Sequence, residues 1–221
     1  MPFRTQAGSA GIVFHVLNRS ARRLRLFDSP DDYREFLHCL TRARDRIPLR
    51  ILAYSVMPNH FHLVVWPSQD RELAQFMHVM TSTHAKRWHV WRDTVGCGAV
   101  YQSRYKAFPV QADRHFLIVC RYVERNALRA GLVQRAEEWP WSSLAESAET
   151  GTAVPTDDWP VQRPPDWPTL VNEIQFASEL DQVRQAVQSG LPLGDTSWAL
   201  HTARRLGLEA KPSGRPRKAG K

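Results

Sequence analysis

The first part of the chain contains stretches with an apolar residue at every second position and stretches with apolar residues every three or four positions. The first pattern is typical of β-strands and the second of helices. Together, the two patterns predict, in order, a strand, a helix, two strands, a long helix and a further strand. These elements cover residues 12–19, 30–46, 49–56, 60–66, 73–91 and 100–111.

Local signals indicate where these elements begin and how they pair. Ser29 is suited to cap the first helix, and Pro30 is suited to its first turn. The short turn at 57–59 predicts that the strands on either side of it pair in an antiparallel way. The βαββαβ order predicts an α+β fold with a ferredoxin-like (RRM-like) antiparallel sheet and helices on one face.

A further helix is predicted after this sheet, between a cap at Asp113 and a stop at Gly131. Tyr122 and Asn126 are four residues apart, so they share one face of this helix. That face lies beside an apolar stripe, which we expect to pack on a core. The stripe consists of Phe116, Val119, Cys120, Val123, Ala127 and Ala130.

His60 and His62 are the strongest candidates for chemistry in the predicted sheet. They are two residues apart in a strand and therefore point to the same face. Two neutral imidazoles in this arrangement can bind one divalent metal ion and leave coordination positions open. The alternative is a pair of partly exposed histidines that bind nothing. Two ligands alone do not complete a metal site, so other residues would have to supply the rest. Tyr122 and Asn126 are candidates to complete it.

Five ordered blocks carry a family resemblance. They read FHVLNR at 14–19, AYSVMPNHFH at 53–62, YQSRYK at 101–106, RYVERN at 121–126 with RAGLV at 129–133, and WPWSS at 139–143. These blocks resemble the REP-associated tyrosine transposases, a branch of the single-tyrosine HUH transposases related to bacterial insertion sequences. The family usually has Asn-Pro where this chain has Asn126-Ala127. Without the proline, we expect the helix to run straighter after the tyrosine.

The resemblance implies a metal-dependent DNA strand transferase. Tyr122 would attack a phosphate of single-stranded DNA at hairpins of repetitive extragenic palindromes and form a 5′-phosphotyrosine intermediate. His60, His62 and Asn126 would hold Mg²⁺ or Mn²⁺. Two nitrogen ligands suit Mn²⁺ better than Mg²⁺, so the choice of metal stays open. The sequence names no general base for the phenol.

Two other functions are compatible with these residues. One is a DNA-hairpin binding protein or regulator that keeps the fold and does not cleave. The other is a metal nuclease in which water, rather than Tyr122, attacks the phosphate. Tyr54, Tyr101 and Tyr105 are rival nucleophiles within the tyrosine mechanism.

The net charge of +8 is spread unevenly along the chain. Residues 1–136 carry 21 Lys and Arg against 10 acids, residues 137–181 one Arg against 10 acids, and residues 201–221 seven bases against one acid. Basic regions at both ends indicate contacts with nucleic-acid phosphates. The chain has 25 Arg and only 5 Lys, and codon bias is the alternative explanation for this preference for arginine.

We assign DNA contacts to three basic residues of the first region. Arg104 and Lys106 flank Tyr105 in a strand that we expect to face the substrate, with the aromatic rings stacking or packing. Arg19 is also assigned to DNA, and a surface ion pair is its alternative role.

We divide the chain into four regions: an IS200-like HUH transposase domain at 8–136, an acidic Trp- and Pro-rich connector at 137–169 packed on it, a helical extension at 170–208, and a basic tail at 209–221. Helices are predicted within the extension at 170–188 and 196–206. The tail should be disordered when free. Its Arg215, Arg217 and Lys218 resemble an AT-hook, which lays arginines along the minor groove of A·T-rich duplex DNA. A solubilising tail is the alternative.

The remaining features place the protein in the bacterial cytoplasm, on the nucleoid when bound to DNA. Its three cysteines form no Cys-x-x-Cys pair, so neither a disulfide framework nor a cysteine zinc site is indicated. No apolar run reaches the roughly 20 residues of a membrane span, and the first residues lack the apolar region of a signal peptide. The C-terminal additions favour a monomer slightly over a homodimer.

Overall fold

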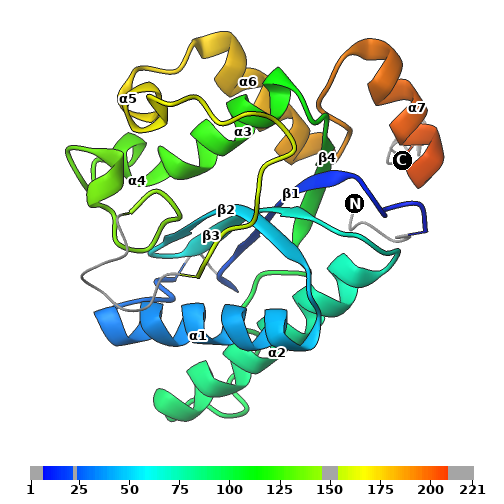
Figure 1. Cartoon of the computed structure of the whole chain (residues 1–221). Coiled ribbons are helices and arrows are strands. Elements are labelled where there is room, and N and C mark those ends of the chain that lie inside the picture. Colours follow the sequence, from blue (N-terminus) through cyan, green and yellow to red (C-terminus); the bar gives the residue numbers. More distant parts are fainter. Residues whose placement is uncertain (1–6, 22–23, 146–153, 209–221) are drawn as a thin grey trace, which may run out of the picture.

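A four-stranded antiparallel sheet forms the centre of the protein (Figure 1). The computed structural model describes residues 7–21, 24–145 and 154–208. The strands lie in the order β2-β3-β1-β4, and α1 and α2 connect β1 to β2 and β3 to β4, which confirms the predicted βαββαβ order. The elements are β1 (Val13–Arg19), α1 (Pro30–Arg46), β2 (Arg50–Met57), β3 (His60–Trp66), α2 (Glu72–Trp91) and β4 (Lys106–Val110).

Helices cover both faces of this sheet: those of the βαββαβ unit lie on one face, as predicted, and the later helices lie on the other. α1 and α2 lie on one face, and α3 lies on the other with α4, α5 and α6 (Figure 1). The second layer forms because the apolar stripe of α3 has to be buried, and the open face of the sheet is the surface available to it. Its helices are α3 (Arg114–Glu124), α4 (Asn126–Arg129), α5 (Trp167–Asn172) and α6 (Ala177–Ser189).

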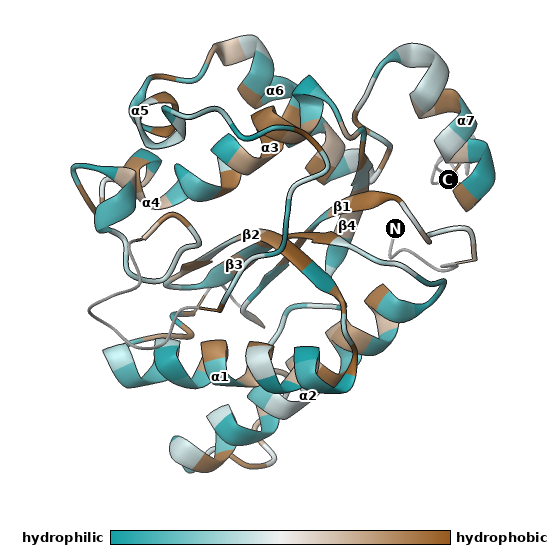
Figure 2. Ribbon diagram, in the orientation of Figure 1, coloured by the Kyte–Doolittle hydropathy of each residue, from teal (hydrophilic) through white to brown (hydrophobic). Residues whose placement is uncertain are grey.

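Each face of the sheet has its own apolar core. Phe14, Phe61 and Val65 belong to the core under α1 and α2, whereas Val13 and Val64 belong to the core under α3. Neighbouring strand residues point to opposite faces, so strands buried on both sides need apolar residues at consecutive positions. Figure 2 shows the consequence, with brown segments in the sheet between helices of mixed brown and teal.

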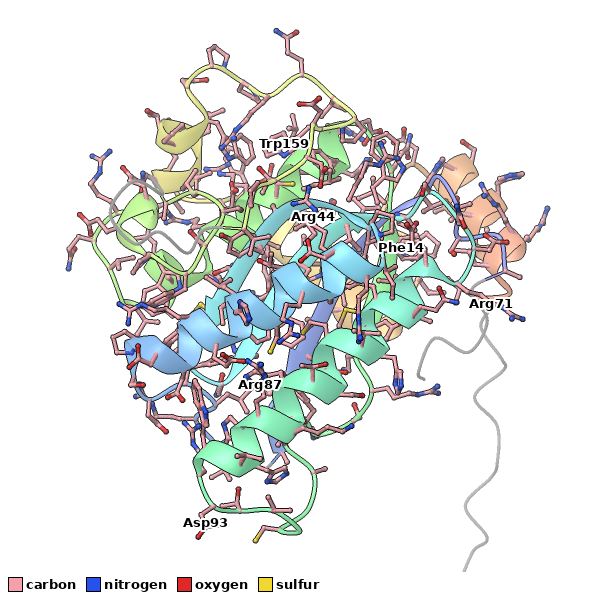
Figure 3. All side chains as sticks on the ribbon, turned by 60° about the horizontal axis from the view of Figure 1, so that its bottom comes forward. Phe14, Arg44, Arg71, Arg87, Asp93 and Trp159 are labelled. Carbon is pink, nitrogen blue, oxygen red and sulfur yellow. The ribbon has the colours of Figure 1, made fainter. Side chains whose placement is uncertain are left out.

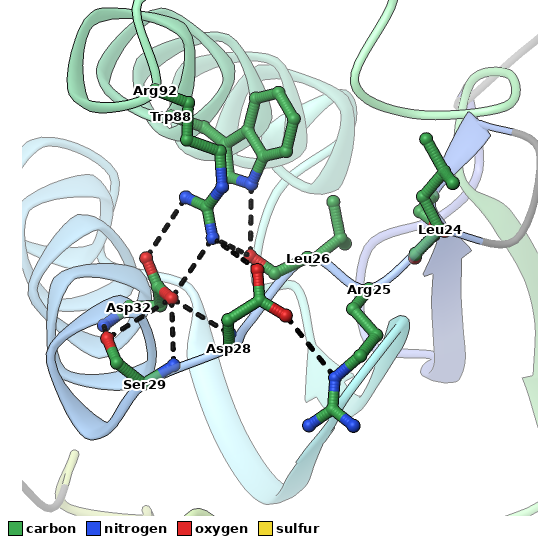
Figure 4. A network of polar contacts seen from close by, with 9 residues as sticks. Leu24, Arg25, Leu26, Asp28, Ser29, Asp32, Trp88 and Arg92 are labelled. Carbon is green, nitrogen blue, oxygen red and sulfur yellow. Dashed lines mark hydrogen bonds and ion pairs between the residues drawn. The ribbon is translucent and has the colours of Figure 1, made fainter.

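Polar contacts hold α1 and α2 together at the loop that precedes α1. The side chain of Ser29 caps α1, and its partner in the capping box is Asp32. Arg92, at the end of α2, binds the carboxylates of Asp28 and Asp32 at 3.1 and 3.0 Å, and the indole of Trp88 donates to the Leu26 carbonyl (Figure 4). The loop and both helices are therefore joined in one layer.

The connector after α4 crosses the sheet and is held by its tryptophans. The indoles of Trp139 and Trp159 donate to the backbone carbonyls of Val56 and Leu52 in β2. Arg44 of α1, marked with Trp159 in Figure 3, binds the Asp157 carboxylate at 3.0 Å. These contacts fasten the acidic connector to the strand beneath it.

Two predicted elements are shorter than expected. The strand predicted at 100–111 begins only at Lys106, opposite Leu17 of β1, because residues 102–105 bend out of the ladder before Tyr101 makes an isolated bridge with Ser20. The helix predicted at 170–188 is divided into α5 and α6 at 173–176. The buried Gln175 donates to the Ile118 carbonyl there, which fixes the turn between the two helices.

The end of the described chain agrees with the sequence. α7 (Thr196–Leu206) has the bounds predicted for it. The tail residues Arg215, Arg217 and Lys218 lie outside the described residues. None of the described helices is both long and apolar enough to cross a membrane.

Candidate active site

The register of β1 against β3 brings the candidate residues together. Leu17 pairs with His62 and Arg19 with His60, so these side chains share one face of the sheet. His15, two residues before Leu17, points to the same face. This is the face that α3 covers, and Tyr122 is on α3.

Three histidines form a contiguous group on this face. The rings of His60 and His62 have centroids 5.0 Å apart, and the ring of His15 stacks on His62 at 5.0 Å with an interplanar angle of 12°. Nε2 of His15 lies 2.9 Å from Nδ1 of His62. His15 was missed by the sequence analysis, although a histidine in an otherwise apolar strand was a visible signal. Its partnership with His62 depends on the register.

Hydrogen bonds on the Nδ1 atoms define how the two predicted histidine ligands can act. Nδ1 of His60 lies 2.7 Å from Oδ1 of Asn59, which accepts only, so Nδ1 carries the proton and the lone pair is on Nε2. When His62 donates from Nδ1 to His15, its lone pair is also on Nε2. A metal ion would then be bound by two Nε2 atoms, each oriented by a partner on the far side of its ring.

Burial keeps these imidazoles neutral near pH 7. Desolvation lowers the pKa of His15 to about 3. Desolvation, with smaller effects from the charges of Arg19 and Arg129, lowers the pKa of His60 to about 4. The pKa of His62 is lowered well below its ordinary value, first by desolvation and then by its neighbours. Neutral imidazoles are the form that binds metal ions.

Tyr122 and Asn126 complete the group from the other side. The Tyr122 ring stands edge-on to His15 and His62, with centroid distances of 6.2 and 5.9 Å. Asn126 is buried, and its Oδ1 accepts a hydrogen bond of 2.9 Å from Nη2 of Arg129. The guanidinium of Arg129 in turn lies 4.1 Å from the centre of the Tyr122 ring.

The helix that carries these residues is broken, contrary to the expectation of a straighter helix. Arg125 separates α3 from α4 with a ψ of −2°. Its guanidinium donates to the carbonyls of Val171 and Asn172 at the end of α5, a tertiary contact that the local sequence does not indicate. The helix then ends before Ala130, which is exposed, so its predicted place in the buried apolar stripe is wrong. Gly131 stops it at a φ of 69°, as predicted.

A metal ion at this site would need an oxygen ligand besides the imidazoles. Within the described ranges, no three His, Cys, Asp or Glu side chains are arranged to hold a metal. The Asn126 carbonyl oxygen has a second lone pair beyond the one that Arg129 uses. Two neutral imidazoles and one amide oxygen fit a divalent ion that keeps open positions for a phosphate.

The basic residues assigned to DNA contacts lie in two separate places on the protein. Arg19 is half-buried beside His60, and its Nε has no hydrogen-bond partner. Arg104 and Lys106 are exposed at the edge strand β4 and the segment before it. Arg104 lines a groove between that segment and α2.

Two of the three rival tyrosines, Tyr101 and Tyr54, are poorly placed to act as nucleophiles. Tyr101 is buried, and its hydroxyl lies 2.7 Å from Nδ1 of His84. The Tyr54 hydroxyl accepts a hydrogen bond from the backbone of Val154, and burial raises the pKa of Tyr54 to about 12. Neither lies among the three histidines.

A buried carboxylate fixes the position of α3. Glu124 accepts hydrogen bonds from Oγ of Ser143 at 2.7 Å and from the indole of Trp167 at 2.6 Å. Ser143 also contacts the backbone of Tyr54 in β2, so Glu124 links the tyrosine helix to the connector, to α5 and to the sheet. Burial raises the pKa of Glu124, although both hydrogen bonds oppose the shift.

We expect Glu124→Ala to lower the free energy of unfolding by about 2–4 kcal/mol, because it removes two hydrogen bonds to a buried carboxylate. Urea unfolding followed by tryptophan fluorescence measures this change. Glu124→Gln is the matched variant for pH. A raised pKa in the folded state means that wild-type stability falls as pH rises from the ordinary glutamate pKa through the raised one. The Gln variant should therefore gain stability relative to wild type over that interval; a constant difference would contradict this account.

Comparison with known proteins identifies one matching family. The family model described as "Transposase IS200 like" matches residues 9–126, a segment that includes His60, His62, Tyr122 and Asn126. The chain is also similar to a solved structure described as "Structure of the REP associates tyrosine transposase bound to a REP hairpin". The sequence identity is 19% and the TM-score 0.49, over 66% of this chain and 84% of that chain. A search of curated proteins gave no significant match.

Proposed function

Because the chain belongs to the IS200-like transposase family, we propose that it is a single-tyrosine strand transferase that cuts and rejoins single-stranded DNA at hairpins. One observation carries the proposal. Tyr122, from the helical layer, stands against His62, which lies beside His60 on the sheet, and Arg129 links Tyr122 to Asn126. This group combines a nucleophile with ligands for a metal ion.

Tyr122 is the nucleophile in this proposal. Its hydroxyl oxygen attacks the scissile phosphorus, a bond between that oxygen and phosphorus forms, and the bond from phosphorus to the 3′ oxygen breaks. The phenol gives up its proton, and the departing 3′ oxygen takes one up. A 5′-phosphotyrosine link and a free 3′-hydroxyl result. Attack by another 3′-hydroxyl reverses the step and rejoins DNA strands without ATP.

His60, His62 and Asn126 would hold Mg²⁺ or Mn²⁺ beside the phosphate. The bound ion supplies Lewis-acid chemistry, withdrawing charge from the phosphoryl oxygens. Two observations support the assignment: the imidazoles of His60 and His62 have lowered pKa values, and each has a partner at Nδ1 that leaves Nε2 to the metal. Asn59 and His15 act as those partners and orient the ligands.

We propose hairpins of repetitive extragenic palindromes as the substrate, on the basis of the five sequence blocks. Arg19 would contact DNA at the reacting phosphate, and Arg104 and Lys106 would contact it at the edge of the sheet. Arg215, Arg217 and Lys218 would add salt-dependent affinity for A·T-rich duplex. We further propose that a monomer suffices for the reaction.

The full chain should form a covalent complex with a labelled single-stranded hairpin that carries flanking sequence on both sides. We expect a band resistant to denaturation with Mn²⁺ or Mg²⁺, and none with EDTA. Denaturing gels and mass spectrometry of the adduct measure it.

Two results would replace this function by another. Tight binding to varied hairpins without cleavage would favour a hairpin-binding regulator. Metal-dependent cleavage that leaves no protein on the DNA would favour a hydrolytic nuclease.

A further inference from the structure

We propose that Arg129 is a further catalytic residue, which binds a non-bridging oxygen of the reacting phosphate while it holds the Tyr122 ring and the Asn126 amide in place. This inference rests on the proposed strand-transfer function. In the sequence, Arg129 stands out only as the first residue of the RAGLV block at 129–133.

Arg129 touches both residues that α3 and α4 contribute to the site. Its guanidinium carbon lies 4.1 Å from the centre of the Tyr122 ring, a cation-π distance. Its Nη2 donates to Oδ1 of Asn126 at 2.9 Å. These contacts bring a fixed positive charge to the nucleophile and to the predicted oxygen ligand at the same time.

Several N–H donors around this charge have no hydrogen-bond acceptor. Nη1 of Arg129 and Nδ2 of Asn126 are buried and have no hydrogen-bond partner, and the same holds for Nε of Arg19 across the histidine pair. All three are N–H donors, which an anion with several acceptor oxygens can satisfy. A phosphate diester has two such oxygens free.

The positive charge of Arg129 also lacks a counter-ion. Among the described residues, no carboxylate lies within ion-pair distance of Arg129 or Arg19. Desolvation lowers the pKa of Arg129, as expected for a charge that burial penalises. Burying an unpaired charge is unfavourable, and a bound phosphate would supply the missing partner.

Arg125 shows what a purely structural arginine looks like in the same helical segment. Four residues earlier, its Nη1 donates to the carbonyls of Val171 and Asn172 and so ties α5 to the break between α3 and α4. Protein groups satisfy that donor. The Nη1 atom of Arg129 has no such acceptor and lies beside the nucleophile.

The role requires no additional reactant. The guanidinium keeps its protons throughout, while the Tyr122 oxygen forms its bond to phosphorus and the 3′ oxygen leaves. Donors placed on an oxygen where negative charge increases stabilise the transition state more than the ground state. Bidentate or forked donation to phosphate is specific to arginine, so lysine should substitute only in part.

The test compares Arg129→Gln and Arg129→Lys with Arg114→Gln, a matched loss of charge. Arg114 is exposed at the start of α3, and its partner is the surface carboxylate of Asp195. Two quantities are measured for each full-length variant: the rate of adduct formation at saturating hairpin with Mn²⁺, and the dependence of hairpin affinity on salt in EDTA. Circular dichroism and thermal melting check folding.

We expect Arg129→Gln to lower the adduct rate about 100-fold or more, the effect of removing one donor to a developing oxyanion. Arg129→Lys should recover part of this loss. The slope of log affinity against log salt should fall by about 1 in Arg129→Gln, because one phosphate contact is lost. Arg114→Gln should change the adduct rate by no more than about threefold.

Three results would overturn the inference. A rate and a salt slope in Arg129→Gln equal to those of Arg114→Gln would show that Arg129 does not contact the phosphate. Equal losses in the Gln and Lys variants with an unchanged salt slope would assign it a structural role. Absence of any adduct from the wild-type protein would remove the proposed function itself, and this inference with it.

Discussion

Tyr122→Phe is expected to abolish the covalent adduct, with a fall in rate of at least about 10⁴-fold, limited by the sensitivity of the gel. The substitution removes only the hydroxyl oxygen that would bond to phosphorus. The ring, which packs edge-on against His15 and His62 and under Arg129, is kept. Hairpin affinity in EDTA should therefore stay within about threefold of wild type. The measurement is a time course of adduct formation with Mn²⁺ on denaturing gels.

The matched control for this variant is Tyr33→Phe. Tyr33 lies on α1, on the opposite face of the sheet, where its ring stacks on Trp141. It also loses one phenol oxygen, yet it should form the adduct at the wild-type rate. Adduct formation that survives Tyr122→Phe would mean that another residue is the nucleophile.

His62→Ala is expected to weaken Mn²⁺ binding by more than about 100-fold and to remove metal-dependent adduct formation, since a ligand is lost outright. His60→Ala should have a comparable effect. His15→Ala removes the partner of Nδ1 on His62 and leaves both ligands, so a loss of about 10–100-fold in metal affinity is expected. Electron paramagnetic resonance of Mn²⁺ measures free and bound ion without relying on activity.

His78→Ala serves as the control for metal binding. His78 is exposed on α2, away from the face that α3 covers, and it should leave Mn²⁺ affinity unchanged. A loss of Mn²⁺ affinity that is largest for His62→Ala, smaller for His15→Ala and absent for His78→Ala would support two Nε2 ligands, with His15 orienting His62. Equal Mn²⁺ affinity in all variants would place the metal elsewhere or exclude it from the protein.

Elements with strong local signals were predicted close to their observed bounds. Ser29 and Pro30 define the start of α1 through a cap and a first-turn proline, and α1 begins at Pro30. The alternation of apolar residues likewise located β3. Signals of this kind act over a few residues, so tertiary contacts do not change them.

The errors occur where distant contacts interrupt an element. Arg125 breaks the tyrosine helix while it bonds to carbonyls of α5, and Gln175 fixes a turn inside a predicted helix through the carbonyl of Ile118. The segment before Lys106 has strand-like residues, but residues 102–105 bend away from β1 before Tyr101 pairs again with Ser20. Helix and strand propensities contain no information about such partners.

For the candidate site, the local sequence determined which side chains share a face: His60 with His62 in a strand, and Tyr122 with Asn126 in a helix. Only the tertiary structure decided what surrounds them. Pairing of β1 with β3 in one register places His15 against His62 and Arg19 beside His60, and packing of α3 on that face places Arg129 over Tyr122. Register and packing arise from hydrogen bonds and burial between residues far apart in the chain, which local periodicity does not encode.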